Sequence, residues 1–382
     1  VDIAQLRFWL ALVVEEVNPH PLPNLDYKIM QGNSLLEQYE GIDLSKTALM
    51  EAPKARNITL FEEPETEYGF SKENKESIKQ LVKDYFEEEV KDEKARIHKA
   101  IDRIVLDHID KSLEGFENQL LIEIATFEKR YEDKIERLTV SQRVQFDNKS
   151  KELKEIAKRQ KQLKNKGKAR QNLLKFEETD ERPYFLWHLY FMDVFEQGGF
   201  DVMIGNPPYI QIQKMDIAEK QPLAEASFNT YSRTGDIYCL FYEKGFKLTK
   251  EQGVLSFITS NSWMKTKYGK PLRDLLTTQF KAEKLLNFED TRIFPSATVE
   301  VNILIGRNDS SDHLTKPVAI TNLSSNISIN KFFVENSVIL DSLDDSEWII
   351  LPKEDLVIKS QIESCSEPLK NLDIDKEVVV NN

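Results

Sequence analysis

Four consecutive residues, Asn-Pro-Pro-Tyr at positions 206 to 209, have the side chains best suited to chemistry in this chain of 382 residues. An apolar run, Val202 to Ile204, precedes them and predicts a short buried strand that stops at this loop. Two adjacent prolines fix the backbone, and open α/β sheets bind their ligands at the carboxyl ends of strands. The pattern therefore predicts a rigid binding loop at the edge of a sheet.

The predicted loop offers two hydrogen-bond acceptors and a ring. The side-chain carbonyl of Asn206 and the backbone carbonyl of Pro207 would both accept hydrogen bonds from a flat amino group. Pro208 restricts the loop further, and Tyr209 offers an apolar face on which a planar ring could stack. This combination indicates methylation of the amino group of a base, although a purely structural turn remains an alternative.

The tetrapeptide resembles the signature of S-adenosylmethionine-dependent amino methyltransferases, chiefly the adenine-N6 DNA methyltransferases. Three further segments, Ile3 to Leu10, Asn24 to Lys28 and Gly32 to Ser34, resemble the adenine methyltransferases of combined restriction-and-modification (type IIG) enzymes. The second resemblance implies that Asn33 contacts the adenine of S-adenosylmethionine, although a simple Asx turn would explain the same residues. We also assign Asp236 to the cofactor-binding residues.

A turn that begins at Phe294 is the second predicted contact with the target base. In the family that this chain resembles, the phenylalanine of such a Phe-Pro turn packs on the base, which makes Phe294 the proposed partner of Tyr209. An ordinary core phenylalanine remains the alternative. The target atom lies inside a DNA duplex, so the base would have to be flipped out, and these two rings would replace its lost stacking.

The order of elements predicts an α/β fold. Helices and strands alternate with short links around the catalytic loop, which is typical of an open, doubly wound sheet. The individual predictions include a strand at Tyr27 to Met30, a core helix at Arg182 to Phe195, strand-like segments at Val318 to Leu323, Lys331 to Val334 and Trp348 to Leu351, and a helix near Glu354 to Glu363. The resemblance implies a Rossmann-like S-adenosylmethionine-dependent methyltransferase core.

We divide the chain into four regions: a first part of the methyltransferase core (1–70), a long α-helical, coiled-coil-like insertion (71–180), the catalytic part of the core (181–308) and the start of a C-terminal target-recognition region (309–382). In the insertion, apolar residues recur at steps of three and four, which predicts an antiparallel helical hairpin. Its segment 151–175 contains ten basic and two acidic residues, a local charge of +8. These cations could neutralise DNA phosphates, and a solvated helix surface is the alternative.

Several absences make the predicted core incomplete. No Gly-x-Gly turn precedes Gly32, and no acidic residue suited to the ribose hydroxyls of the cofactor is identifiable. The chain also begins at Val1 within a helical pattern, so we treat it as a fragment that lacks an N-terminal segment of the same protein. The isolated chain is accordingly expected to bind S-adenosylmethionine weakly or not at all and to be inactive alone.

Composition excludes several classes of protein. The net charge of −13 argues against a wholly basic nucleic-acid wrapper, and no apolar run is long enough to cross a membrane. The two cysteines, Cys239 and Cys365, and the five histidines do not cluster, so we expect no metal site or disulfide and a cytoplasmic location. Neither cysteine adjoins a proline, which argues against a cytosine-C5 methyltransferase.

We therefore predict a site-specific, adenine-specific DNA methyltransferase that transfers a methyl group from S-adenosylmethionine to adenine N6 in double-stranded DNA, within a type II restriction-modification system. Four alternatives remain: a phage-defence methyltransferase without a nuclease, an RNA or protein-glutamine methyltransferase, a non-catalytic DNA-binding subunit with a degenerate fold, and the chemically close N4-cytosine methyltransferases. The last of these usually carry serine where this chain has Asn206. The recognition sequence, a nuclease and the oligomeric state stay open.

Overall fold

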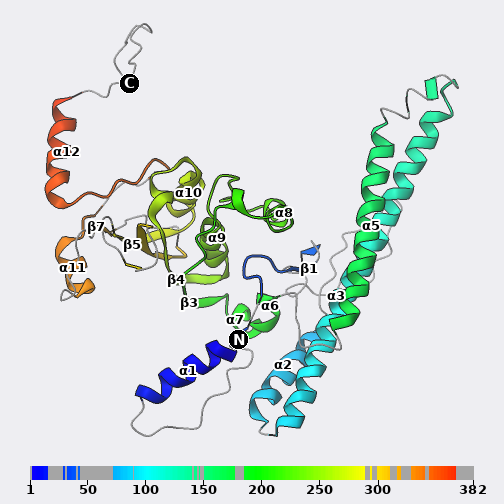
Figure 1. The fold of residues 1–382 in the computed structure, drawn as a ribbon, viewed down its shortest axis with the longest axis horizontal. Coiled ribbons are helices and arrows are strands. Elements are labelled where there is room, and N and C mark those ends of the chain that lie inside the picture. The colour runs from blue at the N-terminus through cyan, green and yellow to red at the C-terminus, as the bar shows by residue number, and fades with distance from the viewer. Residues whose placement is uncertain are drawn as a thin grey trace. The chain divides into compact units, whose positions relative to one another are not determined.

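The computed structural model describes residues 2–15, 29–30, 32–39, 42–43, 72–88, 90–139, 142–143, 146, 150–176, 185–288, 293–294, 299–309, 316–319, 328–339 and 344–366. The chain forms two compact units, Val1–Met192 and Asp193–Asn382, which we call the helical unit and the sheet unit. Long helices make up most of the first unit, and the second unit contains the larger sheet (Figure 1). The strand predicted at Tyr27 to Met30 lies largely outside the described residues, and the division into four regions stays a prediction.

The helical unit is built around two long helices that lie side by side. Its elements are α1 (Asp2–Glu15), β1 (Gln38–Tyr39), β2 (Ile42–Asp43), α2 (Lys72–Glu87), α3 (Lys91–Ile135), α5 (Lys151–Lys175) and α6 (Trp187–Tyr190). The ion pairs between α3 and α5 show that the two helices are antiparallel, because the residue numbers of the partners fall along α3 as they rise along α5. These pairs are Lys134 with Glu152, Glu123 with Arg159, and Asp110 with Arg170.

Apolar side chains at helical spacing hold this hairpin together. Ile101, Val105, Ile109 and Leu113 of α3 are buried, and they belong to one cluster with Ala169 and Leu173 of α5. Residues three and four apart share one face of a helix, so these positions form a continuous apolar stripe. The predicted helical hairpin is confirmed.

The prediction of one continuous helix from Arg182 to Phe195 is wrong. Where the structure describes this segment, it forms two short helices, α6 and α7 (Met192–Glu196), separated at Phe191 by a non-helical backbone with φ −121° and ψ 37°. The Trp187 indole donates to the Ser34 carbonyl at 2.9 Å and meets the ring of Phe185 edge to face at 4.8 Å. Trp187 thus has a packing role.

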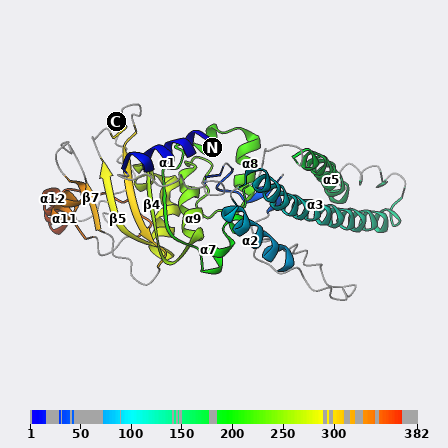
Figure 2. The same ribbon diagram turned by 90° about the horizontal axis from the view of Figure 1, so that it is seen from below.

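The sheet unit is built on a mixed, five-stranded sheet in the order β3-β4-β6-β5-β7 (Figures 1 and 2). Its strands are β3 (Phe200–Gly205), β4 (Thr249–Ser260), β5 (Lys281–Phe288), β6 (Val301–Arg307) and β7 (Lys316–Ala319). Strand β3 runs parallel to β4, and β5 runs parallel to β7. Strand β6 lies antiparallel between β4 and β5, so β4 and β5 point the same way.

Helices cover both faces of this sheet. The helical elements are η2 (Ile212–Lys214), α8 (Ile217–Glu225), α9 (Tyr238–Leu248), η3 (Asn261–Met264), η4 (Lys267–Gly269), α10 (Lys270–Thr278), α11 (Ile329–Asn336) and α12 (Lys353–Cys365). Successive side chains of a strand point to opposite faces. Accordingly, Leu285 and Leu304 pack with α9 and α10, whereas Leu286 and Ile303 pack with Phe333 of α11.

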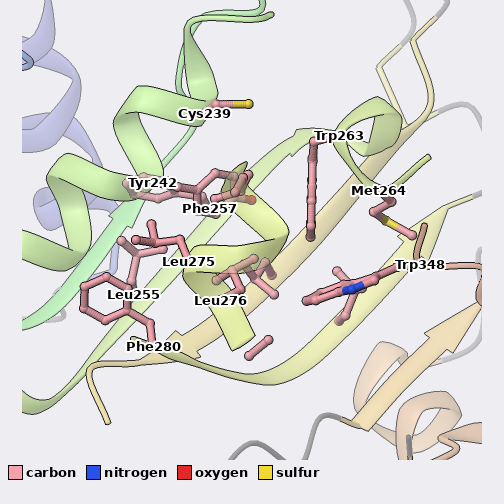
Figure 3. Packing of buried hydrophobic residues seen from close by; sticks show 14 of the residues in the cluster. Cys239, Tyr242, Leu255, Phe257, Trp263, Met264, Leu275, Leu276, Phe280 and Trp348 are labelled. Atoms are coloured by element: carbon pink, nitrogen blue, oxygen red, sulfur yellow. The ribbon is translucent and has the colours of Figure 1, made fainter. Parts of the chain in front are cut away.

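The larger of these two clusters extends to a distant part of the chain. Figure 3 shows Trp263 and Trp348 pointing toward one another, and their rings are 5.2 Å apart at 68°. The Trp348 backbone amide also donates to the Met264 carbonyl at 2.9 Å. Trp348 and Ile350 therefore complete the core beside α10, without forming the predicted strand.

Two further predictions are corrected. The run Val202 to Ile204 is a strand as expected, but it is not buried: Val202 is 55% exposed and Ile204 81%. Among the described strands β3 lies at the edge of the sheet, next to β4 alone, so its side chains lack a second neighbour. The segment Lys331 to Val334 is helical because α11 turns Phe333 onto the sheet. The strand predicted at Val318 to Leu323 is present in part as β7 (Lys316–Ala319), and its last four residues lie outside the described part of the chain. The helix predicted near Glu354 to Glu363 is present as α12.

Buried His108 makes the stability of the helical unit pH-dependent. It is 5% exposed on α3, and burial lowers its pKa from 6.5 to about 4. A histidine with a depressed pKa binds its proton in the unfolded state first, so stability is lost as pH falls from 6.5 toward 4. The full loss expected from this group well below pH 4 is about 3 kcal/mol, and about 2 kcal/mol of it falls between pH 7 and pH 4.5. Urea unfolding of wild type and His108→Leu at pH 7 and pH 4.5 measures it: the variant should lose less stability, and equal losses would contradict the assignment.

Candidate active site

The Asn-Pro-Pro-Tyr loop begins where β3 ends. A Cβ on Gly205 would lie 3.0 Å from the ring of Phe257, so the backbone passes close to β4 at this point. Asn206 and Pro208 are exposed, Pro207 is buried and Tyr209 is half-buried. The loop is thus anchored by one proline and keeps the Asn206 amide accessible to a ligand.

The Tyr209 ring is fixed at both ends. Its hydroxyl donates to the Ile258 carbonyl at 3.1 Å, and its ring meets Tyr238 edge to face at 6.1 Å. The ring contacts the apolar clusters of both faces, which places it at the end of the sheet where the two layers meet. Burial raises the pKa of the Tyr209 phenol, so it stays protonated and can donate at neutral pH.

Asp236 lies directly beside this loop. The Ile237 amide donates to the Ile210 carbonyl and the Ile212 amide donates to the Gly235 carbonyl, both at 2.9 Å. A β-bridge between Gln211 and Asp236 continues this pairing. The two segments are therefore held together as a short ladder, and Asp236 shares the carboxyl edge of the sheet with the loop.

Tyr268 orients the Asp236 carboxylate, and sequence reasoning missed it. The Tyr268 hydroxyl donates to Asp236 Oδ2 at 2.7 Å and lies 2.9 Å from the Tyr238 hydroxyl. Burial raises the pKa of both phenols, which keeps the chain of hydroxyls protonated. The 32 positions that separate Tyr268 from Asp236 leave no local signal for this contact.

A polar network of mostly buried side chains ties the strand ends together. The Asn261 side-chain nitrogen donates to Asn287 Oδ1 at 3.0 Å and to Glu300 Oε2 at 3.1 Å. Beside it, Thr259 donates to Asn302 Oδ1 at 3.0 Å. These hydrogen bonds join separate strands, although the buried side-chain nitrogen of Asn287 has no hydrogen-bond partner in the described part of the chain. This network was not predicted, and it fixes the ends of β4 and β5 against the start of β6.

Phe294 belongs to the same apolar cluster as Tyr209. The two residues pack against a group made of Leu286, Phe288, Val301 and Phe333. The structure thus brings the two predicted base-stacking residues to one cluster, while the same packing also suits an ordinary core phenylalanine. The stacking role of Phe294 stays a prediction, and the turn residues that follow it lie outside the described part of the chain.

Asn33 lies in the helical unit, where it closes an Asx turn. Its side-chain oxygen accepts hydrogen bonds from the Leu35 amide at 3.0 Å and the Leu36 amide at 3.2 Å. This is the simple turn that the sequence also allowed. Because the oxygen is engaged, the side-chain nitrogen is the group that would donate to an adenine ring, and the cofactor contact stays a prediction.

Of the two residues predicted to bind S-adenosylmethionine, Asn33 and Asp236, the second has a side chain whose chemistry suits this cofactor. This cofactor has a positively charged sulfonium and an ammonium group, and the half-buried carboxylate of Asp236 suits a cation at the edge of the sheet. Cys239 is buried and burial raises its pKa, so its thiol is neutral and unsuited to nucleophilic attack. In the described part of the chain, no three metal-ligating side chains are grouped. None of its helices is long and apolar enough to span a membrane.

The mixed sheet, its covering helices and the loop at its carboxyl edge form an incomplete Rossmann-like core of the methyltransferase type. The family model "Eco57I restriction-modification methylase" matches residues 1–294. The chain belongs to this family, which confirms the resemblance seen in its motifs.

Curated relatives show the same similarity. The chain is 26% identical to the type II restriction enzyme and methyltransferase RM.Eco57I of Escherichia coli over 184 aligned positions. The alignment covers 48% of this chain and 18% of that protein. The chain is 27% identical to RM.MjaORFECS2P of Methanocaldococcus jannaschii over 98% of this chain and 31% of that protein. It is also 35% identical to the type II methyltransferase M.XhoI of Xanthomonas vasicola over 25% of this chain and 18% of that protein.

The chain spans between 18% and 31% of the length of these relatives. Among solved structures, it is similar to the type IIG restriction endonuclease BpuSI, with 21% identity, 32% of this chain and 15% of that chain covered, and a TM-score of 0.28. The match of the family model over residues 1–294 places the chain in the family.

Glu243 supports the segment that leads to Asp236. Its fully buried carboxylate accepts hydrogen bonds from the amides of Asn229 and Thr230, the Thr230 hydroxyl at 2.9 Å and the Lys247 ammonium at 2.5 Å. Burial alone would raise its pKa, but these hydrogen bonds outweigh burial and lower it below 4.5. The carboxylate is therefore charged at neutral pH and holds residues 229 and 230 against α9.

We predict that Glu243→Ala lowers the free energy of unfolding by about 3 kcal/mol at pH 7, because it leaves the buried amide and hydroxyl of Thr230 without their acceptor. A group with a depressed pKa stabilises the fold above pH 4.5, and this contribution fades as pH falls through the lower folded-state value. The gap between wild type and variant should thus shrink at pH 3. Urea titration measures both, with exposed Glu251→Ala as the matched control. Equal stability of the two variants would refute the role of Glu243.

Proposed function

We propose that this protein is the modification part of a type II restriction-modification system and transfers a methyl group from S-adenosylmethionine to adenine N6 in double-stranded DNA. The observation that carries the proposal is the Asn-Pro-Pro-Tyr loop. It leaves the β3 edge with Asn206 exposed and with Tyr209 fixed by a hydrogen bond to Ile258. Membership of the Eco57I restriction-modification methylase family supports DNA as the substrate.

The amino nitrogen of adenine is a weak nucleophile because its lone pair is delocalised into the ring. Hydrogen bonds from N6 to the Asn206 side-chain oxygen and the Pro207 carbonyl would favour a pyramidal nitrogen with an available lone pair. When bound, S-adenosylmethionine supplies the electrophilic methyl group. The contribution of the chain is then orientation and charge placement, which need neither a strong base nor a covalent intermediate.

The extruded base also needs a surface that replaces its stacking. The apolar face of Tyr209 would take this role on one side, and Phe294, from the same cluster, would assist it. Asp236 would bind a cationic part of the cofactor beside the loop, in the orientation set by Tyr268. Tyr209 follows β3, Asp236 precedes α9 and Tyr268 lies in η4, so the packed elements of the sheet unit hold these residues.

Methylation of cytosine N4 is the second candidate, because it uses an exocyclic amine of the same geometry and the same pair of acceptors. The Asn206 that opens the loop favours adenine within the resemblance, since the cytosine enzymes usually carry serine there. The products differ chemically. Digestion of methylated DNA to nucleosides followed by mass spectrometry separates N6-methyladenine from N4-methylcytosine.

We predict that Asn206→Ala lowers the rate of tritiated methyl transfer to duplex DNA by about 100-fold or more, the usual effect of removing one positioned polar group from a reacting centre. The protein is assayed with its natural flanking sequence. Asn229→Ala is the control, because this asparagine is exposed in the same unit and contributes only its backbone amide to Glu243. The control should transfer methyl groups at the wild-type rate.

The outcomes separate the alternatives. Transfer that survives Asn206→Ala would refute the catalytic role of the loop. Transfer by wild type to RNA or to a glutamine-containing peptide, with none to duplex DNA, would replace the substrate class. Absence of transfer to any of the three substrates would favour a DNA-binding subunit with a degenerate fold.

A further inference from the structure

The long helix α5 has arginines on the face turned toward α3 and lysines on the opposite face. Arg170 donates to Asp110 of α3 through two nitrogens at 2.5 and 2.8 Å, and Arg159 donates to Glu123 of α3 at 2.5 Å. The hydrogen bonds with these carboxylates raise the pKa of both guanidinium groups. Together with the buried side chain of Leu173, the arginines fix which face of α5 turns toward α3.

The opposite face of α5 has a row of lysines. Their side chains are exposed, and steps of three, four or seven residues place them on one side of the helix, within an arc of about 120°. We call this group the lysine row: Lys154, Lys158, Lys161, Lys164, Lys168 and Lys175. In the described part of the chain, these six lysines form no ion pair with a carboxylate, and Lys175 contacts the Asn172 side chain at 3.2 Å.

The acidic residues of α5 do not neutralise this row. Glu152 pairs with Lys134 of α3, and Glu155 pairs with Arg159 on the face turned toward α3. Like charges three and four residues apart on a helix destabilise it by roughly 0.2–0.5 kcal/mol per pair. The chain therefore concentrates repelling charge on one face while its net charge is −13.

Length and composition suit an extended polyanion. Lys154 and Lys175 are separated by about 32 Å along the helix axis, close to one turn of a DNA duplex at about 34 Å. Helices that bind membranes also need an exposed apolar face, but the apolar face of α5 is buried against α3. Lysines are hydrated point charges, which suits phosphate contacts that carry no sequence information.

We propose that the lysine row binds the phosphate backbone of duplex DNA without reading its sequence. The inference rests on the proposed function for the choice of DNA over another polyanion, and it assigns to the helical unit a contact separate from the catalytic loop. The row raises affinity for any duplex, whereas the sheet unit supplies the chemistry.

The test compares two variants with the same change of charge. The row variant replaces Lys154, Lys158, Lys161 and Lys164 by glutamine, which has a similar helix propensity. The control variant replaces four exposed lysines that form no row, namely Lys83, Lys99, Lys111 and Lys129, by glutamine. Fluorescence anisotropy gives the Kd for a labelled duplex of arbitrary sequence over a series of salt concentrations. Circular dichroism checks that both variants keep their helices.

The row variant should bind at least about 10-fold more weakly at low salt, and its slope of log K against log salt should fall by up to about 3.6, or about 0.9 for each lost phosphate contact. The control should stay within about threefold of wild type. Equal behaviour of the two variants would overturn the proposal. A row variant that binds the duplex normally but no longer binds polyglutamate would also overturn the proposal. The row would then be a surface for an acidic protein.

The proposed function can fail separately. Asn229→Ala, the control for methyl transfer, should bind this duplex with the wild-type Kd and salt slope, because Asn229 lies outside both the row and the catalytic loop. If no protein transfers methyl groups while the row variant alone loses affinity, the proposed function fails and the row stands. If Asn206→Ala abolishes transfer while row and control variants bind alike, the row fails and the proposed function stands.

Discussion

One constraint organises the sheet unit: the chain must leave β3 through a loop that cannot relax. Two prolines restrict the backbone, Pro207 is buried, and the Tyr209 hydroxyl is bonded to the Ile258 carbonyl on β4. The loop is thereby tied to the strand beside it, while Asn206 stays exposed. A transfer reaction that depends on the direction of a lone pair needs this kind of fixed geometry more than it needs reactive side chains.

The surrounding residues make this loop stiff from three directions. The ladder at Gln211 and Asp236 holds its far end, and Glu243 holds the segment before Asp236. The Asn261 network joins the ends of β4 and β5. Each of these contacts joins positions remote in sequence, so the edge of the sheet is specified by tertiary structure and by buried hydrogen bonds rather than by local propensity.

Sequence reasoning succeeded where the signal is local. The apolar stripe of α3, the strand before Asn206 and the helix after Asp236 all follow from periodicity within one segment. It failed where an answer depends on neighbours: the exposure of Ile204 follows from the order of strands, and the pairing of Tyr268 with Asp236 follows from chain folding. The sequence of Lys331 to Val334 fits a strand, and packing of Phe333 on the sheet makes it a helix.

The central claim is that this rigid loop receives a base turned out of the duplex. The most direct measurement is the fluorescence of 2-aminopurine placed at the adenine that we propose as the methylation target, because this analogue brightens when it leaves the stack. We expect the 2-aminopurine fluorescence to rise when wild type binds the duplex. With Tyr209→Ala we expect a different fluorescence intensity from that of the wild-type complex, because the stacking ring is lost. Fluorescence that stays at the level of free duplex while the protein is bound would contradict the central claim.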